Sequence, residues 1–545
     1  MLRDDRPMFL NDVVRGRVSR RQVLARGAAL GLAAPVVAEL LDTVSAAAHR
    51  QEGTATTAHA CSGAITWALE TPPPNVLPYG GIATASWWGK EFMYDSLLEW
   101  DADLAIQPAL AESYESPDEL SYVFHLRQGV TFHDGTPLTA NDVVYSLQQA
   151  VAPPPPGVVV PFLSNIAGVE AVDAATVRVT MSKIDPTLPG VLAWGVYTPI
   201  VPAGIYDRIN PLSDGIGTGP FRLVEYVQDD RIVYTCNENY WKAGVPCIKD
   251  LTLKVLADEQ SRVAALRSGE IDGGTFSSDV MLTLEQDDSI QALSGLFAAP
   301  RVIVFNMTRE VPWRDTRVRQ AINLVVDRQE IVDKVYGGDA ELTGAISPGY
   351  GDWPLSDDAL RQLYATDLER AKALMSEAGM AEGFDVTLLA ISAPRDYVQI
   401  AEIVREQVKQ LNINVTVEQL EIGTFAKNTS EGTFEWASTG RGMRGDPSGF
   451  VIDFRSGTAV YDNWFAGGWK NDELDTLYDE ALTTLDPAVR LDLYRRIQEI
   501  IAADAPNLYT VQPLKYQAVT SRVSGMSVSY LGTNPGLRVA CVTDE

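Results

Sequence analysis

The sequence predicts an α/β protein with more than one domain. Its 545 residues amount to several times the length of a typical single domain. The order strand–helix–strand between Phe384 and Leu420 predicts a parallel βαβ unit. With 46% hydrophobic and 21% charged residues, the composition is that of a globular protein. This composition excludes a disordered chain and a polytopic membrane protein.

The chain carries a large excess of negative charge. It has 44 Lys and Arg against 72 Asp and Glu, which gives a formal net charge of -28 at pH 7. This balance argues against sequence-independent binding of nucleic acid and against docking on anionic lipid. Only four histidines are present, and two of them, His49 and His59, lie near the N-terminus. We therefore expect no metal and no cofactor.

Residues 1–48 have the features of an export signal. The twin-arginine pair Arg20 and Arg21 is followed by a small-residue apolar stretch, and Ala46 and Ala48 suit a signal peptidase. The apolar stretch is short and contains Pro35, which makes it a poor transmembrane helix. The alternative is a frayed basic tail, which does not account for these three features in this order. We predict twin-arginine export to an extracytoplasmic location, with residues 49–62 as a linker.

The four cysteines all follow this signal, and an even number in an exported chain predicts disulfides. Three pairings are possible. Because Cys236 and Cys247 flank a turn-rich stretch, a local bridge between them is the natural expectation, which leaves Cys61 to pair with Cys541. Lipidation of Cys61 is a further alternative, but Ala58 stands where a branched apolar residue is needed.

Alternation of apolar residues and capping signals predict the elements of the chain after its linker. Strands are expected at 64–69, 121–126, 176–180, 231–236, 251–256, 302–306, 384–390 and 414–420. Helices are expected at 92–100, 141–147, 259–267, 317–326, 328–336, 367–378, 396–411, 473–484 and 487–503.

Two glycine-containing segments have residue patterns that are typical of turns. The first segment is Phe132-His133-Asp134-Gly135-Thr136-Pro137, whose pattern is typical of a strand end, a turn that needs glycine and a proline that ends the strand. His133 and Asp134 are therefore expected to shape a turn and to perform no chemistry. The second segment is Gly217-Thr218-Gly219-Pro220, and no Gly-Lys-Ser/Thr sequence follows it. We therefore expect a crossing between domains at this segment and no phosphate-binding site.

Several segments, taken in order, resemble one protein family. They are 122–146, which contains His133-Asp134-Gly135-Thr136-Pro137, then Gly217–Phe221, Asn239-Tyr240-Trp241, Ser268–Asp272, Phe305-Asn306, Asp315–Ile322 and Asp327-Arg328. This ordered set resembles the extracytoplasmic solute-binding proteins of ABC importers, family 5, the peptide/nickel/oligosaccharide type. The similarity extends from about Ala64 to the C-terminus.

The resemblance implies a periplasmic-binding-protein-like (type II) α/β fold, with two main lobes, a hinge and an inserted third lobe. Lobe I would be discontinuous, built from 63–100, 216–308 and 512–545. Lobe II would be the insertion 101–215, and lobe III would be 309–511. A solute would lie between lobes I and III, and hinge closure would bury it. A Cys61–Cys541 bridge would then lie within one lobe.

Peptide-binding relatives hold the peptide ammonium with an aspartate, and the matching segment here departs from that pattern. Depending on the alignment, Met443 or Arg444 stands at the aspartate's position. A buried ammonium needs an anionic partner, so the usual mode of peptide binding is in doubt unless Asp446 or another acid substitutes. If Arg441 or Arg444 faces the cleft, a carboxylate or polyhydroxyl ligand is attractive; otherwise both are surface residues.

Aromatic and amide side chains complete the predicted site. Flat rings suit sugar faces and apolar groups, although core packing is the default for any single tryptophan. The residues expected to bind ligand are Trp87, Trp88, Phe305, Asn306, Trp436, Arg441, Met443, Arg444, Asp446 and Trp464. Asn306 could donate to ligand or close a turn.

The leading hypothesis is a binding protein, without turnover, that delivers an oligopeptide, sugar or carboxylate-bearing compound to an ABC permease. A secreted hydrolase is the alternative. The chain has no Gly-x-Ser-x-Gly or His-Glu-x-x-His motif, but a carboxylate pair could cleave glycosides. A chemoreceptor-coupled or chaperone-like role of the same fold also stays open. No nucleic-acid partner is expected.

Overall fold

The computed structural model describes residues 61–80, 84–102, 104–153, 161–210, 212–440, 446–457 and 468–543. These residues belong to one compact unit, Ala60–Glu545. The predicted export signal, 1–48, lies outside the described residues. Within the described ranges, none of the helices combines the length and apolar character needed to cross a membrane.

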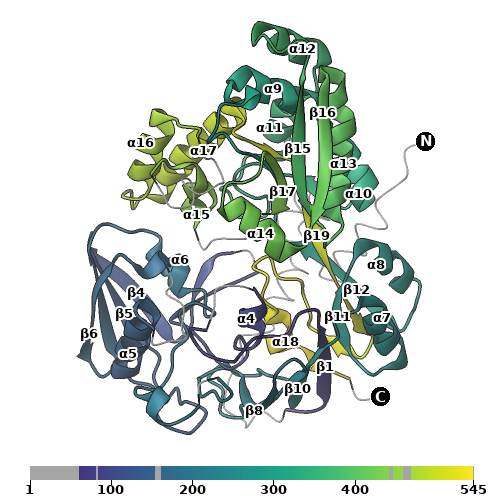
Figure 1. Cartoon of the computed structure of the whole chain (residues 1–545). Coiled ribbons are helices and arrows are strands. Elements are labelled where there is room, and N and C mark those ends of the chain that lie inside the picture. The colour runs from purple at the N-terminus through teal and green to yellow at the C-terminus, as the bar shows by residue number, and fades with distance from the viewer. Residues whose placement is uncertain are drawn as a thin grey trace, which may run out of the picture. The chain divides into compact units, whose positions relative to one another are not determined.

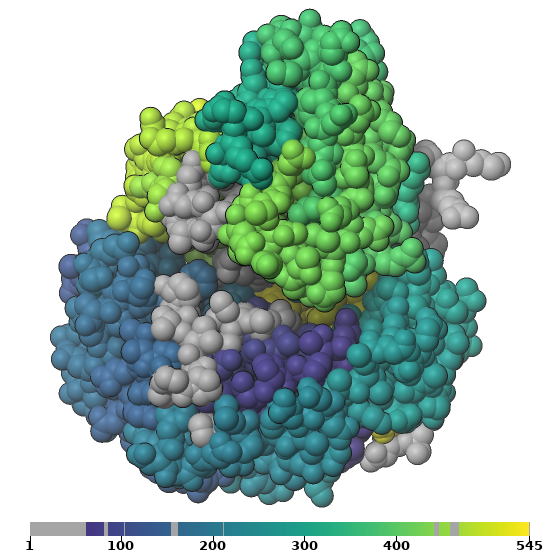
Figure 2. Space-filling model, in the orientation of Figure 1, coloured from purple at the N-terminus to yellow at the C-terminus, as the bar shows by residue number. Residues whose placement is uncertain are grey.

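An eight-stranded sheet unites distant parts of the chain. Its strands are β1 (Ala64–Leu69), β8 (Phe221–Val227), β9 (Arg231–Cys236), β10 (Asp250–Val255), β11 (Gly273–Phe276), β12 (Ile290–Leu296), β14 (Ala340–Leu342) and β19 (Val511–Thr520). Their order is β12-β19-β11-β1-β10-β9-β8, with β14 paired to the far end of β19. Figures 1 and 2 show the N-terminal (purple), middle (teal) and C-terminal (yellow) segments meeting in this region. Helices α7 (Glu259–Ser268) and α8 (Ser278–Leu284) pack beside β11, β12 and β19.

A four-stranded antiparallel sheet is formed by the insertion that follows β3 (Ile106–Pro108). It consists of β4 (Ala111–Asp118), β5 (Ser121–Leu126), β6 (Ile166–Asp173) and β7 (Thr176–Met181), in the order β4-β5-β7-β6. Helix α5 (Ala140–Val151) packs on β6 and β7. The Asp142 carboxylate accepts hydrogen bonds from the Thr139 amide at 2.8 Å and the Thr139 hydroxyl at 2.7 Å, which stabilises the start of α5.

A five-stranded sheet forms the centre of the remaining part. Its strands are β13 (Arg301–Phe305), β15 (Phe384–Ile391), β16 (Ile413–Leu420), β17 (Trp436–Gly440) and β18 (Asn507–Tyr509), in the order β16-β15-β17-β13-β18. Its helices are α9 (Thr316–Val325), α10 (Arg328–Tyr336), α11 (Asp357–Leu363), α12 (Leu368–Glu377), α13 (Asp396–Val408), α14 (Ile422–Ser430), α15 (Pro447–Val451), α16 (Asp472–Ala481) and α17 (Pro487–Asp504). The β15–α13–β16 unit is parallel, as predicted.

Short elements connect these sheets. They are α4 (Thr84–Trp88), β2 (Leu98–Trp100), β3 (Ile106–Pro108), α6 (Leu188–Leu192), β20 (Val523–Ser524), α18 (Pro535–Val539) and β21 (Cys541–Val542), with single 3-10 turns at Pro161–Leu163, Ile205–Asp207, Pro312–Arg314, Lys409–Leu411 and Ile452–Phe454. The predicted helix at 92–100 is wrong, because its last residues form β2, which pairs with β3. A short apolar run of this kind fits a strand as well as a helix.

The division into three lobes and its boundaries stay a prediction. Two strands differ from the expected division. β14 pairs with β19 in the eight-stranded sheet, although its residues fall in the range 309–511 expected for lobe III. β13 belongs to the five-stranded sheet, although its residues fall in the range 216–308 expected for lobe I. We therefore propose that the boundary between lobes I and III lies just before Arg301.

The predicted disulfide pairing is wrong. The bonds join Cys61 to Cys236 and Cys247 to Cys541, with Cα–Cα distances of 6.5 and 5.0 Å. β1 and β10 run parallel, so Cys61 and Cys247 lie beside each other just ahead of these strands, and the Ser62 amide donates to the Cys247 carbonyl at 2.9 Å. Each then bonds to a cysteine from another segment.

Candidate functional site

A cavity of about 250 Å³ lies between two parts of the chain. One contains the four-stranded sheet (the four-stranded part), and the other contains the five-stranded sheet (the five-stranded part). Its walls come from distant segments of the chain. The lining residues are Trp100, Leu104, Ile106, Pro186, Gly190, Tyr350, Gly351, Trp353, Asp446, Pro447 and Arg490. Most of these side chains are apolar or aromatic, which is the usual lining of a small-molecule site.

Two aromatic walls of the cavity are held by further rings. Tyr350 is buried and stacks on Tyr530, with ring centroids 6.3 Å apart and planes 8° from parallel. Trp353 meets Tyr494 edge-on at 5.8 Å. Because both rings are supported from behind, the cavity presents fixed flat surfaces to an occupant.

A buried ion pair forms the polar part of the lining. One guanidinium nitrogen of Arg490 donates to both carboxylate oxygens of Asp446 at 2.9 Å, and the two side chains are 7% and 12% exposed. Burial alone would lower the pKa of Arg490, but the charge of Asp446 outweighs it and raises this pKa above its usual value. Asp446 also accepts from the Ser448 amide at 2.9 Å, which caps α15. Its charge is therefore already compensated within the protein.

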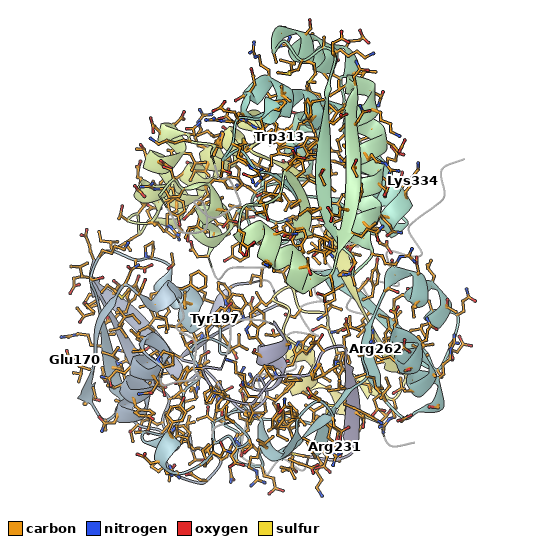
Figure 3. The ribbon with its side chains drawn as sticks, in the orientation of Figure 1. Glu170, Tyr197, Arg231, Arg262, Trp313 and Lys334 are labelled. Carbon is orange, nitrogen blue, oxygen red and sulfur yellow. A yellow bond between two sulfur atoms is a disulfide. The ribbon has the colours of Figure 1, made fainter. Side chains whose placement is uncertain are left out.

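The structure places Phe305 and Trp436 in the core of the five-stranded sheet. They are cross-strand partners in β13 and β17, 1% and 0% exposed, with ring centroids 5.1 Å apart. Trp313 packs edge-on against Trp436 at 5.7 Å and lies inside this part, whereas Lys334 projects from its surface (Figure 3). Core packing is therefore the role that the geometry assigns to both predicted ligand residues.

Asn306 closes loops of the main chain. Its amide nitrogen donates to the Phe434 and Gly432 carbonyls at 2.8 and 3.1 Å. Its amide oxygen accepts from the Thr308 amide and hydroxyl at 3.1 and 2.6 Å. With these bonds made, the side chain has the turn-closing role rather than the ligand-donating one.

Trp87 and Trp88 do not line the cavity of about 250 Å³. Trp87 packs against Trp194 and Tyr197, with ring centroids 5.3 and 5.7 Å apart. Within the described residues, the indole nitrogens of Trp87 and Trp88 are buried and make no hydrogen bond. Of the other predicted site residues, Asp446 lines the cavity, whereas Arg441, Met443, Arg444 and Trp464 lie outside the described residues.

Sequence reasoning missed the residues that form most of the cavity, notably Tyr350, Trp353 and Arg490. Arg490 lies in a predicted helix, but a helical pattern does not reveal which charged residue turns inward. Trp100 lies in the predicted helix 92–100, which does not form, and belongs to β2. The available signal was weak: Tyr350 and Trp353 flank glycine-rich turns, where binding residues often lie.

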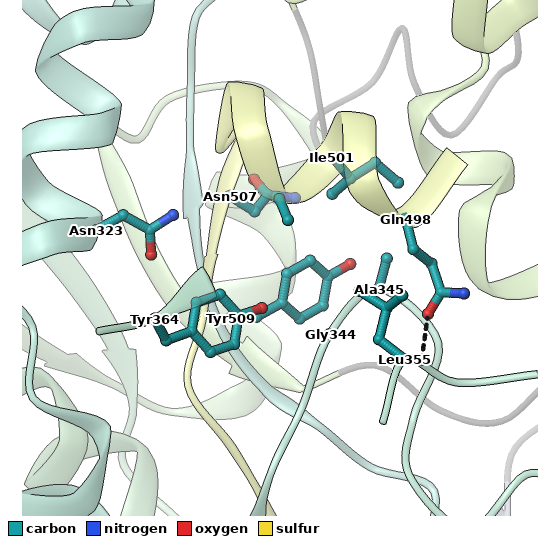
Figure 4. Close-up of a pocket in the computed structure, with 10 residues that line it drawn as sticks. Asn323, Gly344, Ala345, Leu355, Tyr364, Gln498, Ile501, Asn507 and Tyr509 are labelled. Carbon is teal, nitrogen blue, oxygen red and sulfur yellow. Dashed lines mark hydrogen bonds between the residues drawn. The ribbon is translucent and has the colours of Figure 1, made fainter. Parts of the chain in front are cut away.

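A second, internal cavity is too small for an organic solute. It has a volume of about 10 Å³ and lies inside the five-stranded part, between Asn323, Tyr364, Gln498 and Asn507 (Figure 4). Both polar atoms of the buried Asn507 side chain lack a hydrogen-bond partner among the described residues. This volume is enough for one water molecule. A search for clusters of potential metal ligands over the described ranges found none.

Comparison with known proteins relates this geometry to a family. Residues 105–462, more than half of the chain, match the model of "Bacterial extracellular solute-binding proteins, family 5 Middle". The chain is 30% identical over 479 residues to heme-binding protein A of Haemophilus influenzae, covering 81% of this chain and 85% of that one. It is 28% identical over 480 residues to the dipeptide-binding protein of Escherichia coli K12, covering 81% and 87%.

Solved structures agree with this assignment. HbpA2 from Haemophilus parasuis superposes with a TM-score of 0.76 at 26% identity, covering 88% of this chain and 100% of that one. AgaA from A. tumefaciens R10, solved with agropinic acid, gives 0.73 at 26% identity, covering 89% and 99%. The α/β architecture is thus that of the type II periplasmic binding proteins, as predicted. The chain belongs to the bacterial extracellular solute-binding proteins of family 5.

Proposed function

We propose that this extracytoplasmic solute-binding protein captures a small organic solute with an apolar or aromatic group in the cavity of about 250 Å³, and delivers it to an ABC permease. The single observation that carries the proposal is the lining of this cavity by Trp100, Tyr350 and Trp353. Relatives are named for binding heme, glutathione and dipeptides, which are organic solutes.

The aromatic lining argues for contact with flat or apolar groups. Tyr350 and Trp353 offer ring faces, and Leu104, Ile106 and Pro186 add aliphatic surface. Burial of such groups away from water provides the main free energy of capture. Because the walls come from two parts of the chain, a hinge movement that separates them would open the cavity and release the solute.

The ion pair of Asp446 and Arg490 sets a limit on ligand charge at this cavity. Asp446 was the acid that could have replaced the missing ammonium-binding aspartate. Since it is paired to Arg490 through both oxygens, it offers no uncompensated charge. We therefore propose that this cavity takes the uncharged portion of the solute, and that any ammonium group is held elsewhere.

Capture without chemical conversion is the mode of action that the cavity supports. Glycoside hydrolysis uses two carboxyl groups on either side of the scissile bond. The cavity lining contains one carboxylate, Asp446, and it is bound to Arg490. No feature of the lining favours the hydrolase alternative.

We further propose that the chain reaches its location by twin-arginine export. The support is the order of Arg20-Arg21, the apolar stretch and the small residues Ala46 and Ala48. Two disulfides fit an oxidising compartment outside the cytoplasm.

Native mass spectrometry tests solute capture directly. The protein, purified from its own host without denaturation, should carry a retained organic mass that is released on unfolding. The stripped protein should bind members of a broad panel of peptides, sugars, opines and metal chelates, and failure to bind any of them would contradict the proposal.

A cavity-filling substitution tests the location of the site. Ile106→Trp should reduce the affinity for the retained solute at least tenfold, because the larger side chain occupies the cavity. Leu120→Trp, at an exposed position between β4 and β5, is the matched control and should bind as the wild type does. Equal affinity of all three proteins would place the solute elsewhere.

A further inference from the structure

Arg490 lines the cavity of about 250 Å³ (the aromatic cavity) and uses only part of its guanidinium group. Its Nε atom donates to the Ala481 carbonyl at 3.1 Å, and its Nη2 atom donates to both oxygens of Asp446 at 2.9 Å. Nη2 also lies 3.5 Å from the Tyr494 hydroxyl oxygen. The Nη1 atom makes no hydrogen bond within the described residues. Arg490 therefore keeps donor hydrogens beyond those that its ion pair uses.

Three aromatic side chains of the lining also carry unused polar hydrogens. Within the described part of the chain, the Tyr350 hydroxyl and the indole nitrogens of Trp100 and Trp353 make no hydrogen bond. Indole and guanidinium nitrogens donate and do not accept, whereas a tyrosine hydroxyl does both. The unused polar atoms of these side chains are therefore mostly donors.

Asp446 supplies the only carboxylate among the described residues of this lining, and its oxygens are already occupied. They accept from Nη2 of Arg490 and from the Ser448 amide, each at 2.9 Å. A solute ammonium group would find no uncompensated charge here, and a solute carboxylate would lie beside a second negative charge. A solute hydroxyl would need an acceptor, which these side chains offer only at Tyr350. An uncharged acceptor, such as a carbonyl oxygen, meets none of these penalties.

The Tyr350 hydroxyl keeps its proton and can donate to such an oxygen. Burial raises the pKa of Tyr350 well above its usual value; the charge of Asp446 adds to this shift and the charge of Arg490 opposes it. Because both charged groups act on this hydroxyl, Tyr350 and Arg490 belong to one polar region of the lining.

The shape of the lining favours a flat group. Tyr350 stacks on Tyr530 with planes 8° from parallel, and Trp353 meets Tyr494 edge-on at 5.8 Å, so both rings are supported. The volume of about 250 Å³ is below the roughly 300–1,000 Å³ of pockets that enclose drug-sized ligands, so the cavity suits one group of a solute. An aromatic ring that bears a carbonyl matches both the ring faces and the unused donors.

We propose that the aromatic cavity selects an aryl carbonyl group. The aromatic ring packs against Tyr350 and Trp353, and the carbonyl oxygen accepts from the Tyr350 hydroxyl and from Nη1 of Arg490. The ion pair then has a positive role, because Asp446 fixes the guanidinium group and cancels its charge while Nη1 meets the solute. This inference rests on the proposed function and narrows its substrate class to solutes with an uncharged aryl ketone, ester or amide.

Three probes with one carbon skeleton test this selection. Acetophenone, 1-phenylethanol and ethylbenzene carry a carbonyl, a hydroxyl and no oxygen at the same carbon. Ligand-observed NMR titration of the stripped protein measures the three dissociation constants. Acetophenone should bind about tenfold more tightly than ethylbenzene and at least about threefold more tightly than 1-phenylethanol. Equal affinities, a preference for either of the other probes, or no binding of acetophenone overturns the proposal.

Substitutions assign the preference to the lining. Tyr350→Phe keeps the ring and removes the hydroxyl, so it should weaken acetophenone binding about fivefold and leave ethylbenzene binding unchanged. Ile106→Trp, which fills the cavity, should weaken the binding of both probes at least about tenfold. Tyr114→Phe removes a hydroxyl from a side chain that is 40% exposed on β4, and this matched control should keep the wild-type affinities. An acetophenone affinity that Tyr350→Phe or Ile106→Trp leaves unchanged contradicts the assignment.

Failure of this inference differs from failure of solute capture. A protein whose retained solute is lost in Ile106→Trp, but which shows no preference for acetophenone, is still a solute-binding protein, and only the selection of a carbonyl is then wrong. A protein that retains no solute and binds neither the broad panel nor the three probes contradicts both proposals.

Discussion

The imidazole of His133 bonds to the main chain at Gly219, with its Nε2 atom 2.9 Å from the Gly219 carbonyl oxygen. Its Nδ1 atom accepts from the Gly217 amide at 3.2 Å, so the ring is neutral and carries its proton on Nε2. The two glycine-containing segments that carry the family resemblance therefore contact one another. His133 has the structural role predicted from sequence, and Asp134 beside it accepts from the Thr136 amide at 3.0 Å.

This contact predicts an acid-sensitive stability. Burial lowers the pKa of His133 to about 4, whereas an unfolded histidine titrates near 6.5. Between these values the unfolded state binds more protons, so stability falls as the pH decreases from 6.5 to 4, by about 3 kcal/mol for this residue. His133→Gln should flatten that part of the profile when urea unfolding is measured between pH 7 and pH 4.5.

The control is His125→Gln, since the His125 side chain is 43% exposed. This variant should keep the wild-type slope. An unchanged slope in the His133 variant would show that the acid sensitivity comes from other groups.

Gly219 should not tolerate a side chain. A Cβ atom there would lie 2.5 Å from the Met93 carbonyl carbon and 2.6 Å from the Phe92 carbonyl oxygen, both main-chain atoms. Gly219→Ala is therefore expected to destabilise the protein by about 1–3 kcal/mol in urea unfolding. Gly168→Ala, where a Cβ meets nothing within 4 Å, should change stability by less than about 0.5 kcal/mol. Equal effects would refute the close-approach argument.

Arg490 should stabilise the protein chiefly through its ion pair with Asp446. Arg490→Met leaves a buried carboxylate unpaired and is expected to cost about 3–5 kcal/mol of stability. Adding Asp446→Asn, which keeps the cap on α15, should restore a large part of that loss. Chemical unfolding of the two single variants and the double variant measures the coupling. If the stability changes of the two single variants simply add in the double variant, the interaction between Arg490 and Asp446 contributes nothing to stability.

The disulfide pairing predicts a specific peptide map. Digestion without reduction should release one peptide pair containing Cys61 and Cys236 and another containing Cys247 and Cys541. The second bond spans 294 residues, so Cys247→Ser with Cys541→Ser should lower stability by up to about 5 kcal/mol in the chain-entropy model. A map with Cys236 joined to Cys247 would contradict the structure.

The elements were largely predictable because local patterns determine them. The helix that begins after Asp327, for example, is capped by that carboxylate, which accepts from the Gln329 amide at 2.9 Å. The parallel βαβ unit from Phe384 to Leu420 follows from the order of elements alone. Both features depend on residues close in sequence, where propensity and capping act.

The disulfides and the site could not be predicted in the same way. Which cysteines meet depends on the register of β1 against β10, and turn-rich spacing between Cys236 and Cys247 carries no information about it. Trp436 is buried because β17 lies between β15 and β13, and a single sequence does not distinguish a central strand from one at the cavity edge. Arg490 faces inward only because Asp446 meets it from another segment.

The position of β19 has a consequence for the biosynthesis of the protein. This strand, made from residues 511–520, inserts between β11 and the edge strand β12 of its sheet. A ribosome that has translated the first five hundred codons therefore holds a nascent chain in which β12 and β14 still lack the strand that joins them to β11, β1, β10, β9 and β8. β12 and β14 can join the other strands only after residues 511–520 leave the exit tunnel, so this sheet is completed late in synthesis.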